Sequence, residues 1–247
     1  METVYVTYEQ DVAVVTLNRE DKRNAVSRQM TMELRQITEE IKANEQVKAL
    51  VLTSRGERAF CSGGDLKELH GDLTEEEAYT VLSPMKELLY EIATLPVPTL
   101  AYLNGEARGG GCELATACDI RIGKEGSRFG FVQGKLGIVP GWGGGALLYE
   151  RISPVQAFHW LTASEVIDAE EAKQLGWLQG MANELDLGIF TTRSREQLRF
   201  WKKQLMENID TSVLYRKMEE ETRQSAALWS SEAHKKAVNA FFSRKNK

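Results

Sequence analysis

Cysteine is scarce in this sequence: Cys61, Cys112 and Cys118 are the only three among 247 residues. An odd cysteine count in a long chain is not the pattern of a disulfide framework, so a reducing compartment is expected. The segment 1–15 lacks a basic stretch followed by an apolar one, so no secretory signal is expected. No hydrophobic run approaches the length that spans a membrane. These absences together predict a cytoplasmic protein that does not associate with membranes.

An excess of positive charge is also missing, because 31 basic and 36 acidic residues give a net charge of −5. Without an overall positive field, nucleic acid is not an expected partner. Hydrophobic residues make up 42% of the chain and charged residues 27%, which is ordinary for a folded globular domain. A small anionic ligand held by a few local cations remains compatible with this charge.

Histidine is equally rare, and His70, His159 and His234 lie far apart in the sequence. They form no metal-ligand spacing with the cysteines, so no metal site is expected. The sequence also contains no Gly-x-Ser-x-Gly elbow and no Walker loop. Serine-nucleophile and nucleotide-phosphate chemistry are therefore not indicated.

The first half of the chain alternates strand-like and helix-like patterns. The expected elements, in order, are strands at Val4–Tyr8 and Val12–Leu17, a helix with Met30, Leu34, Ile37 and Ile41 on one face, a strand at Val47–Thr53, a helix from Thr74 to about Thr94, a strand at Thr99–Leu103 and a helix containing Leu114–Ala117. Gln10-Asp11 is a plausible hairpin turn, and Thr74 with Glu77 matches a capping box. This β, β, α, β, α order predicts an α/β fold.

The second half is mostly helical in pattern. One helix is expected to begin at Ser153-Pro154, with Gln156 as its capping-box partner. Another is expected to begin at Asp168, with Glu171 as the partner.

From about residue 192 onward the pattern is that of amphipathic helices rich in Lys, Arg and Glu. We therefore interpret residues 1–190 as the core domain and residues 191–247 as a C-terminal helical region. Its large apolar side chains either pack on the same domain or cover a neighbouring subunit. They are Trp201, Leu205, Leu214, Met218, Leu228, Trp229, Phe241 and Phe242.

Three glycine-containing segments carry a polar or reactive group, and the first runs Ala59-Phe60-Cys61-Ser62-Gly63-Gly64-Asp65-Leu66. It follows a predicted strand and precedes a helix-like pattern, where glycine lets the backbone turn sharply and bring N–H groups close to a ligand. Asp65 is placed as a helix N-cap. Taken alone, this segment is better interpreted as an ordinary strand-to-helix turn.

The second segment, Asn104 to Leu114, contains the three consecutive glycines Gly109-Gly110-Gly111. Such a run at the mouth of a helix is costly unless something approaches the backbone closely. Free N–H groups and the helix dipole there favour an oxygen that gains negative charge. Glu113 lies three residues past Gly110, so it sits on the same side of the first turn and is a natural general base. The alternative is that Glu113 only complements the helix dipole.

The third segment, Phe129 to Gly145, ends in Gly141-Trp142-Gly143-Gly144-Gly145-Ala146 and so satisfies the G-x-G-x-x-G/A dinucleotide pattern. We reject that interpretation because the segment lies in the middle of the chain, directly after Pro140, with no clear βαβ unit around it. A nicotinamide-dependent oxidoreductase is therefore the weakest of the functional alternatives.

In order and at family-like spacing, these segments resemble the crotonase family, also called the enoyl-CoA hydratase/isomerase family. The resemblance runs from Val12 through Trp177. It is carried by Asn18…Lys22-Arg23-Asn24-Ala25, by the segment 59–66, and by Asn104-Gly105…Gly109-Gly110-Gly111-Cys112-Glu113-Leu114-Ala115…Cys118-Asp119-Ile120-Arg121.

The resemblance implies a spiral of ββα units with C-terminal helices that drive assembly into a homotrimer or homohexamer. It implies an acyl-CoA substrate, with CoA as part of the substrate, and neither a bound cofactor nor a metal. It also implies a thioester carbonyl that accepts hydrogen bonds from two backbone N–H groups and so becomes a stabilised enolate. By position these N–H groups would belong to Ser62 and Gly110. The CoA-contacting positions implied are Lys22, Arg23, Ala25, Ala59, Phe60, Gly63, Gly64, Asp65 and Trp142.

Two catalytic glutamates are typical of hydratases in this family, and Glu113 matches the first. The second belongs to a Phe-Gly-x-Pro-Glu segment, but this sequence has Phe129-Gly130-Phe131-Val132-Gln133. Gln133 can orient water by hydrogen bonds but exchanges no proton near neutral pH. Because general acid–base help is worth ~100–10,000-fold in rate, two-glutamate hydration is in doubt.

Ordinary hydratases of the family have a small residue where this sequence has Trp142. This variant, together with the segment Leu228-Trp229…Ala237-Val238, resembles the branch that contains ethylmalonyl-CoA and methylmalonyl-CoA decarboxylases. Decarboxylation needs the same enolate stabilisation and no base. Trp142 can help desolvate the leaving carboxylate, and Arg108 either pairs with it or faces outward. The favoured function is thus an acyl-CoA enzyme of the hydratase/isomerase type, with a decarboxylase as close alternative and a non-catalytic acyl-CoA binding protein as another.

Overall fold

The computed structural model describes residues 2–65, 68 and 73–245, with side chains described up to residue 240. Its larger sheet has the order β1-β2-β3-β5-β7-β10, and its smaller sheet the order β4-β6-β8-β9. The strands of the larger sheet are β1 (Val4–Glu9), β2 (Val12–Leu17), β3 (Ala49–Ser54), β5 (Thr99–Leu103), β7 (Ile120–Gly123) and β10 (Gly180–Met181). Those of the smaller sheet are β4 (Ala59–Cys61), β6 (Glu106–Arg108), β8 (Arg128–Gly130) and β9 (Ile167–Asp168).

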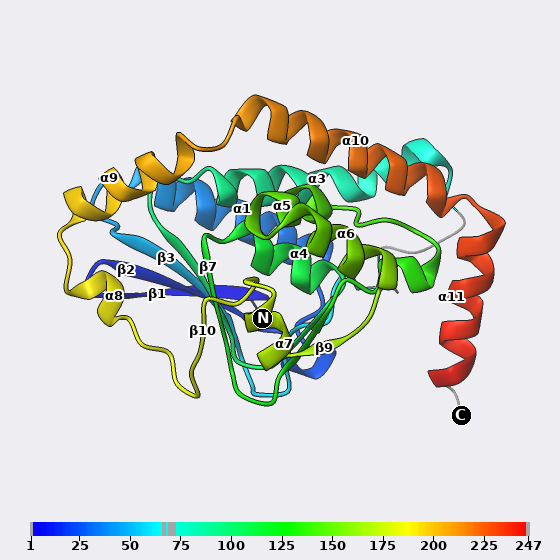
Figure 1. Cartoon of the computed structure of the whole chain (residues 1–247), viewed down its shortest axis with the longest axis horizontal. Coiled ribbons are helices and arrows are strands. Elements are labelled where there is room, and N and C mark those ends of the chain that lie inside the picture. The colour runs from blue at the N-terminus through cyan, green and yellow to red at the C-terminus, as the bar shows by residue number, and fades with distance from the viewer. Residues whose placement is uncertain (1, 66–67, 69–72, 246–247) are drawn as a thin grey trace.

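Most of the helices lie on one side of these sheets (Figure 1), while Phe190 and Leu198, from the C-terminal part of the chain, pack against the opposite face of the larger sheet. The described α-helices are α1 (Arg28–Ala43), α3 (Glu75–Ala93), α4 (Gly110–Ala117), α5 (Gly144–Arg151), α6 (Pro154–Ala163), α7 (Ala169–Gln174), α8 (Gly188–Thr191), α9 (Arg195–Met206), α10 (Thr211–Trp229) and α11 (Glu232–Lys245). Two 3-10 helices, η1 (Glu20–Lys22) and η2 (Gln133–Leu136), lie in loops. None of the described helices is long and apolar enough to cross a membrane.

The larger sheet is antiparallel only where β1 pairs with β2, and the remaining pairs from β2 to β10 are parallel. In the smaller sheet β4, β6 and β8 are parallel. Parallel strands need helical crossovers, which bury the sheet faces and explain the near-continuous apolar runs of β2 and β3. The predicted α/β class is confirmed, whereas the second sheet had no counterpart in the sequence-based prediction.

Local signals placed several elements correctly. Gln10 and Asp11 have φ values of 49° and 68° and link β1 to β2, as the predicted hairpin requires. The capping box at Thr74 and Glu77 opens α3, with both of its hydrogen bonds formed. That at Asp168 opens α7 in the same way.

The capping box expected at Ser153 is wrong. Helix α6 begins at Pro154 as predicted, but the Ser153 side chain makes no cap hydrogen bond. Its φ of −52° and ψ of 131° differ from the φ of −67° and ψ of 165° of Thr74, which does form its cap hydrogen bond. The helix that Asp65 was expected to open falls largely outside the described residues.

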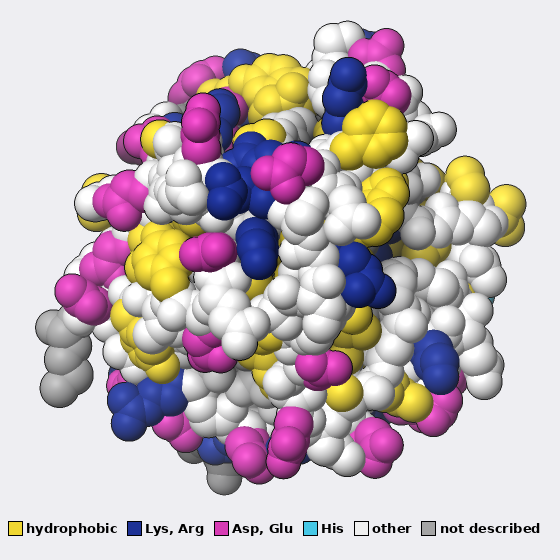
Figure 2. Space-filling view, turned by 90° about the vertical axis from the view of Figure 1, so that its left-hand side faces the viewer, with side chains coloured by type: hydrophobic (Ala, Val, Ile, Leu, Met, Phe, Trp, Pro, Cys, Tyr) yellow, Lys and Arg dark blue, Asp and Glu magenta, His cyan; other side chains and the backbone are white. Residues whose placement is uncertain are grey.

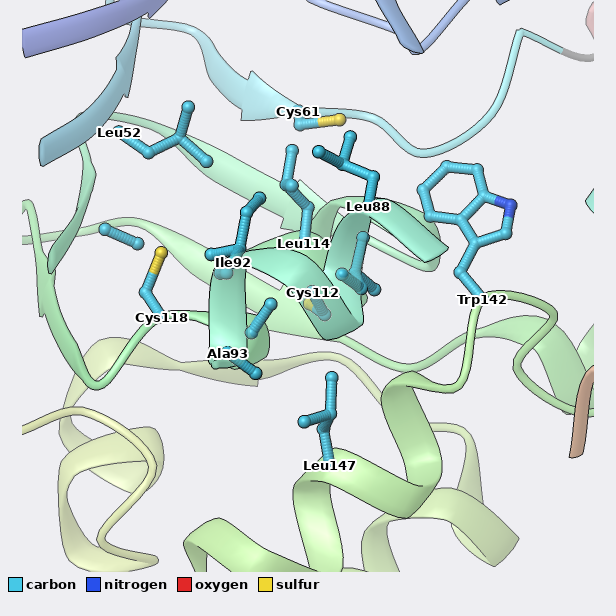
Figure 3. Close-up of a cluster of buried hydrophobic side chains, with 14 of the residues drawn as sticks. Leu52, Cys61, Leu88, Ile92, Ala93, Cys112, Leu114, Cys118, Trp142 and Leu147 are labelled. Atoms are coloured by element: carbon cyan, nitrogen blue, oxygen red, sulfur yellow. The ribbon is translucent and has the colours of Figure 1, made fainter. Parts of the chain in front are cut away.

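The main core lies between the sheets and helices α1, α3, α4 and α5 (Figure 3). All three cysteines are free and buried there, beside leucine and isoleucine side chains. Burial raises the pKa of the Cys61 and Cys118 thiols to about 12. They are inert core residues and not nucleophiles.

The C-terminal helices divide the large apolar side chains between two environments. On α10, Leu214, Met218 and Trp229 are buried, and this helix packs along α3 of the same chain, which confirms the first interpretation for these residues. On α9, Trp201 and Leu205 are 48% and 39% exposed, so for them cover by a neighbouring subunit stays a prediction. Figure 2 shows the face that carries α8 and α9, where hydrophobic side chains lie exposed among acidic and basic ones. The side chains of Phe241 and Phe242 fall outside the described ones.

A buried ion pair ties α9 to the core. Lys202, on α9, has a side chain only 1% exposed, and its Nζ lies 2.7 Å from both carboxylate oxygens of Asp119. Asp119 in turn holds the start of β5, because its Oδ2 accepts from the Thr99 N–H. Arg151 approaches the same carboxylate at 3.5 Å. The cluster joins three parts of the fold around one buried negative charge.

Replacing Lys202 with Ala is expected to lower the free energy of unfolding by about 3 kcal/mol, because the Asp119 charge stays buried with a weakened partner. Urea unfolding followed by circular dichroism measures the change. Lys203→Ala is the matched control, since the Lys203 side chain is 71% exposed and its ammonium pairs with Glu207 at 3.7 Å. That substitution is expected to change stability by less than about 1 kcal/mol. Equal effects of the two would contradict the account of the cluster.

Candidate active site

Glu113 lies in the first turn of α4, which starts directly after β6 and Gly109. Gly109 has a φ of +50°, a conformation that glycine adopts without strain. A Cβ at Gly111 would overlap the carbonyl of Cys61, so β4 and the helix start can approach only because the residue is glycine. The glycine run therefore places the N-terminus of α4 against the segment 59–65, which is the close approach that three consecutive glycines predicted.

The Glu113 carboxylate is enclosed, with the residue 2% exposed. Its Oε2 accepts from the N–H groups of Trp142 at 2.9 Å and Gly144 at 3.0 Å. Its Oε1 accepts from Gln133 Nε2 at 2.8 Å. Burial raises the pKa of Glu113, and these hydrogen bonds oppose the rise without cancelling it. Such a carboxyl group is a candidate for the proton-exchanging residue of the site.

Gln133, at the start of η2, lies beside Glu113 and is also buried. Its Oε1 finds no hydrogen-bond partner among the described residues. A buried amide oxygen of this kind can accept a hydrogen bond from water or from a ligand. The direct bond between the two side chains leaves no room for a water molecule between Gln133 Nε2 and Glu113 Oε1.

The Ser62 N–H is not available to a ligand, because it donates to the Arg23 carbonyl at 3.1 Å. The predicted oxyanion donor at Ser62 is therefore wrong. The cause is the φ of +95° at Gly63, which breaks the strand-like alternation of N–H directions at this point.

Gly64 offers the donor instead. Val26 pairs with Gly64 in a parallel bridge: the Val26 N–H donates to Gly63 O at 2.9 Å, and the Val26 carbonyl accepts from Asp65 N at 2.8 Å. The N–H of Gly64, which lies between these two bonds, therefore points away from Val26. A Cβ on Gly63 would lie 3.3 Å from the Gly110 nitrogen, which places this turn against the start of α4. Within the described residues, the backbone N–H groups of Gly64 and Gly110 have no acceptor. Two such groups side by side are the arrangement that stabilises a developing oxyanion.

Trp142 packs directly over Gly110. A Cβ at Gly110 would overlap the indole ring at Cζ3, and the tryptophan is only 4% exposed. Figure 3 shows its side chain beside Leu88 and Leu114. The indole makes the surroundings of Gly110 apolar, which strengthens any electrostatic interaction made there.

The segment around Asn24 is fastened to the start of β4. Asn24 Nδ2 donates to the carbonyls of Arg55 and Ala59, and its Oδ1 accepts from Arg19 N. The predicted CoA-contacting residues Lys22 and Arg23 lie at the surface of this segment. They are therefore accessible cations on the side of the site where the segments 22–25 and 59–65 meet.

The remaining positions expected to line the CoA site are enclosed. Phe60 is 0% exposed and belongs to the hydrophobic core, so only its backbone can face a ligand. Ala25 and Ala59 are buried as well. The Asp65 carboxylate pairs with Arg19 at 2.9 Å, across the two segments. These residues shape the site through their backbone and through packing.

Arg108 does not face Glu113. Its guanidinium pairs with Glu106 at 3.1 Å and donates to the Arg128 carbonyl. The outward-facing alternative is the one the structure supports, and Arg108 is not available to hold a substrate carboxylate.

Glu221, on α10, was missed by the sequence analysis. Its Oε2 accepts from the N–H groups of Gly145 and Ala146 at 3.1 Å each, in the first turn of α5. It lines a cavity of about 540 Å³ together with Gln133 and Pro140. The signal was helical spacing, because Glu221 falls on the α10 face of buried Met218 and Ser225.

A model of the enoyl-CoA hydratase/isomerase family matches residues 7–247. The mouse mitochondrial methylglutaconyl-CoA hydratase is 35% identical over 165 residues, or 67% of this chain and 52% of that protein. The chicken ethylmalonyl-CoA decarboxylase is 33% identical over 196 residues, or 79% of this chain and 64% of that protein. The matches thus span about half to two thirds of these relatives' lengths.

Solved structures agree in fold. The crystal structure of an enoyl-CoA hydratase from Bacillus halodurans superposes with a TM-score of 0.85 at 25% identity, covering 96% of this chain and 99% of that one. The chain belongs to the enoyl-CoA hydratase/isomerase family. The resemblance inferred from its motifs is confirmed.

Proposed function

We propose that this protein acts on an acyl-CoA thioester and stabilises its enolate between the N–H groups of Gly64 and Gly110. The observation that carries the proposal is this pair of unengaged donors, within the described residues, beside the buried Glu113 carboxyl group. The donors are fixed by the backbone, so they need no rearrangement when the oxygen gains charge. Glu113 supplies the proton-exchanging group, and the exposed Lys22 and Arg23 lie where they can meet CoA phosphates.

Hydration or isomerisation of an enoyl thioester is the family-level reaction. It requires Glu113 to be ionised so that it can take a proton from water or from a carbon atom. Three N–H donors to the Glu113 carboxylate favour that form. Gln133 contributes orientation only, so any hydration here proceeds with one acid–base group at this position.

Decarboxylation of a short-chain malonyl-type thioester is the second candidate, and two observations favour it. Gln133 bonds Glu113 directly, which removes the place for an activated water between them. Trp142 covers Gly110 with an apolar ring, which disfavours a charged carboxylate more than the spread charge of an enolate. The bond between the α-carbon and the carboxylate carbon breaks, and carbon dioxide leaves. The bonding electron pair stays on the thioester as its enolate, and a proton then adds to the α-carbon.

The two reactions are separated by incubating the protein with crotonyl-CoA and, in parallel, with methylmalonyl-CoA and ethylmalonyl-CoA. Mass spectrometry reads a gain of water in the first case and a loss of carbon dioxide in the others. Turnover of crotonyl-CoA or of the malonyl thioesters supports enolate chemistry. Turnover of the malonyl thioesters alone excludes the hydratase assignment. Tight binding of acyl-CoA with no turnover of any of them would leave the non-catalytic binding protein.

We also propose that α9 contacts another copy of the chain in a homotrimer or homohexamer. The support is the exposed group of apolar side chains Phe200, Trp201 and Leu205, which is unusual on a monomer surface. Light scattering after size exclusion is expected to give a mass of three or six chains. A Trp201→Arg, Leu205→Glu double variant is expected to elute as the monomer. A monomeric parent protein would contradict the proposal.

A further inference from the structure

Two carboxyl groups share the first turn of α5. Glu113, from α4, accepts from the N–H of Gly144 at 3.0 Å. Glu221, from α10, accepts from the next two N–H groups, those of Gly145 and Ala146, at 3.1 Å each. The two side chains come from elements more than a hundred residues apart and meet on one short stretch of backbone. Nothing in the proposed chemistry yet uses Glu221.

The glycines of this stretch are what admits both side chains. A Cβ at Gly144 would overlap Cγ of Glu113, and a Cβ at Gly145 would overlap Oε1 of Glu221. The glycine run that imitates a dinucleotide motif therefore serves a different purpose. It lets two carboxyl groups approach consecutive backbone N–H groups.

Both backbone hydrogen bonds to Glu221 go to Oε2. Oε1 accepts no hydrogen bond from the described residues, so it is the oxygen on which a proton can reside. The side chain borders the cavity that Gln133 also lines. Glu221 can therefore hold a proton beside the same cavity as Gln133, whose amide side chain exchanges none.

The other charged and titratable groups around Glu221 lie on α10, α5, α3 and α11 and in the cavity wall. These groups are Lys217 of α10 with Glu150 of α5, Glu219 and Arg223 of α10 with Lys86 and Tyr79 of α3, Lys135 and Tyr149 in the cavity wall, and His234 of α11, which contacts the Leu136 carbonyl. In the described part of the chain, no cation forms an ion pair with Glu221. The negative charge that acts on Glu221 is that of Glu113.

We propose that Glu221 is a positioning residue for the enolate reaction, acting as the proton-holding member of a carboxyl pair with Glu113. The inference rests on the proposed function and extends it. While Glu221 is neutral, the oxyanion site has a single negative charge nearby, that of Glu113. When Glu221 ionises, a second charge opposes both ionised Glu113 and the growing charge of the enolate. Burial and the charge of Glu113 raise the pKa of Glu221 to about 8, so the pair changes state just above neutral pH.

The test compares the wild-type protein with Glu221→Gln, which stays neutral at every pH. Wild-type kcat is expected to fall about tenfold or more between pH 7.5 and 9.5, as Glu221 loses its proton. The Glu221→Gln variant is expected to hold kcat within about twofold over the same range. Glu220→Gln is the matched control, because Glu220 is the neighbour on the same helix that does not bond the α5 backbone, and it should keep the wild-type profile.

A second measurement needs no turnover. The folded-state pKa of Glu221 is raised above the unfolded value, so the folded protein binds the extra proton and wild-type stability falls as pH rises toward 8. Thermal unfolding from pH 5 to 9 should show this fall in the wild type and less of it in Glu221→Gln. In Glu113→Gln the fall in stability should occur at lower pH, because the charge that raises the pKa of Glu221 is gone.

The outcomes separate the two ideas. An alkaline loss of kcat that persists unchanged in Glu221→Gln overturns the role of Glu221 and leaves the proposed function standing. Absence of turnover with every acyl thioester overturns the proposed function. The unfolding profiles then test by themselves whether Glu113 and Glu221 interact as a carboxyl pair. If Glu221→Gln does not fold, an unfolding profile of Glu113→Gln identical to that of the wild type overturns the pair.

Discussion

Glu113→Gln is expected to lower kcat by about 100- to 10,000-fold for hydration or isomerisation of an enoyl thioester, the reactions that need a proton-exchanging base. The substitution keeps the shape of the side chain and removes only its ability to exchange a proton. The fold should survive, because the carbonyl oxygen of the new amide can still accept from the N–H groups of Trp142 and Gly144. The new amide nitrogen can donate to Oε1 of Gln133, which lacks a partner in the described structure, once the Gln133 side chain flips.

Initial rates measured alongside thermal unfolding distinguish lost chemistry from lost structure. Glu106→Gln is the matched control, because Glu106 precedes the same helix but its side chain is 46% exposed and pairs with Arg108. The control should retain wild-type rates. A Glu113→Gln rate within about threefold of wild type would remove Glu113 from the chemistry, since general acid–base catalysis is worth far more.

Gly110→Ala is expected to reduce kcat by about 100-fold or more, the cost of losing one oxyanion donor. The added methyl group would overlap the indole of Trp142 and force either the ring or the start of α4 to move. Overpacking of this kind also lowers the free energy of unfolding by about 1–3 kcal/mol. Both effects follow from one contact, so they should respond together to a change at Trp142.

The double variant Gly110→Ala, Trp142→Ala isolates that contact. Removing the indole clears the space for the new methyl group, so the double variant should be more active than Gly110→Ala alone. The coupling is read as the departure of the double variant from the product of the two single effects. Strict multiplicativity would mean that Trp142 does not constrain Gly110, and the assigned packing would be wrong.

The fold could be predicted where the signal is local. The φ preferences of Gln10-Asp11 and the capping boxes at Thr74 and Asp168 depend on a few neighbouring residues, and each formed as expected. The second sheet could not be predicted in the same way. Strands such as β4 and β6 have three residues each and are defined by pairing between distant segments, which no short pattern encodes.

The site shows the same division. The choice of Glu113 and Gln133 as site residues followed from the order of the motifs, whereas their direct hydrogen bond was seen only in the structure. The second oxyanion donor did not, because one backbone angle at Gly63 decides whether Ser62 or Gly64 faces the site. Glu221 was missed because it stands in a run of three glutamates. Its helical spacing from Met218 and Ser225 selects it only once the structure shows that α10 buries that face.

The most direct test of the account is a crystal structure with a bound acyl-CoA. The thioester oxygen is expected about 2.7–3.1 Å from both the Gly64 and the Gly110 nitrogen atoms, the geometry of an oxyanion hole. The α-carbon should lie within reach of Glu113. A thioester oxygen bound to neither N–H group, or bound to the N–H of Ser62 after its bond to Arg23 has broken, would contradict the account.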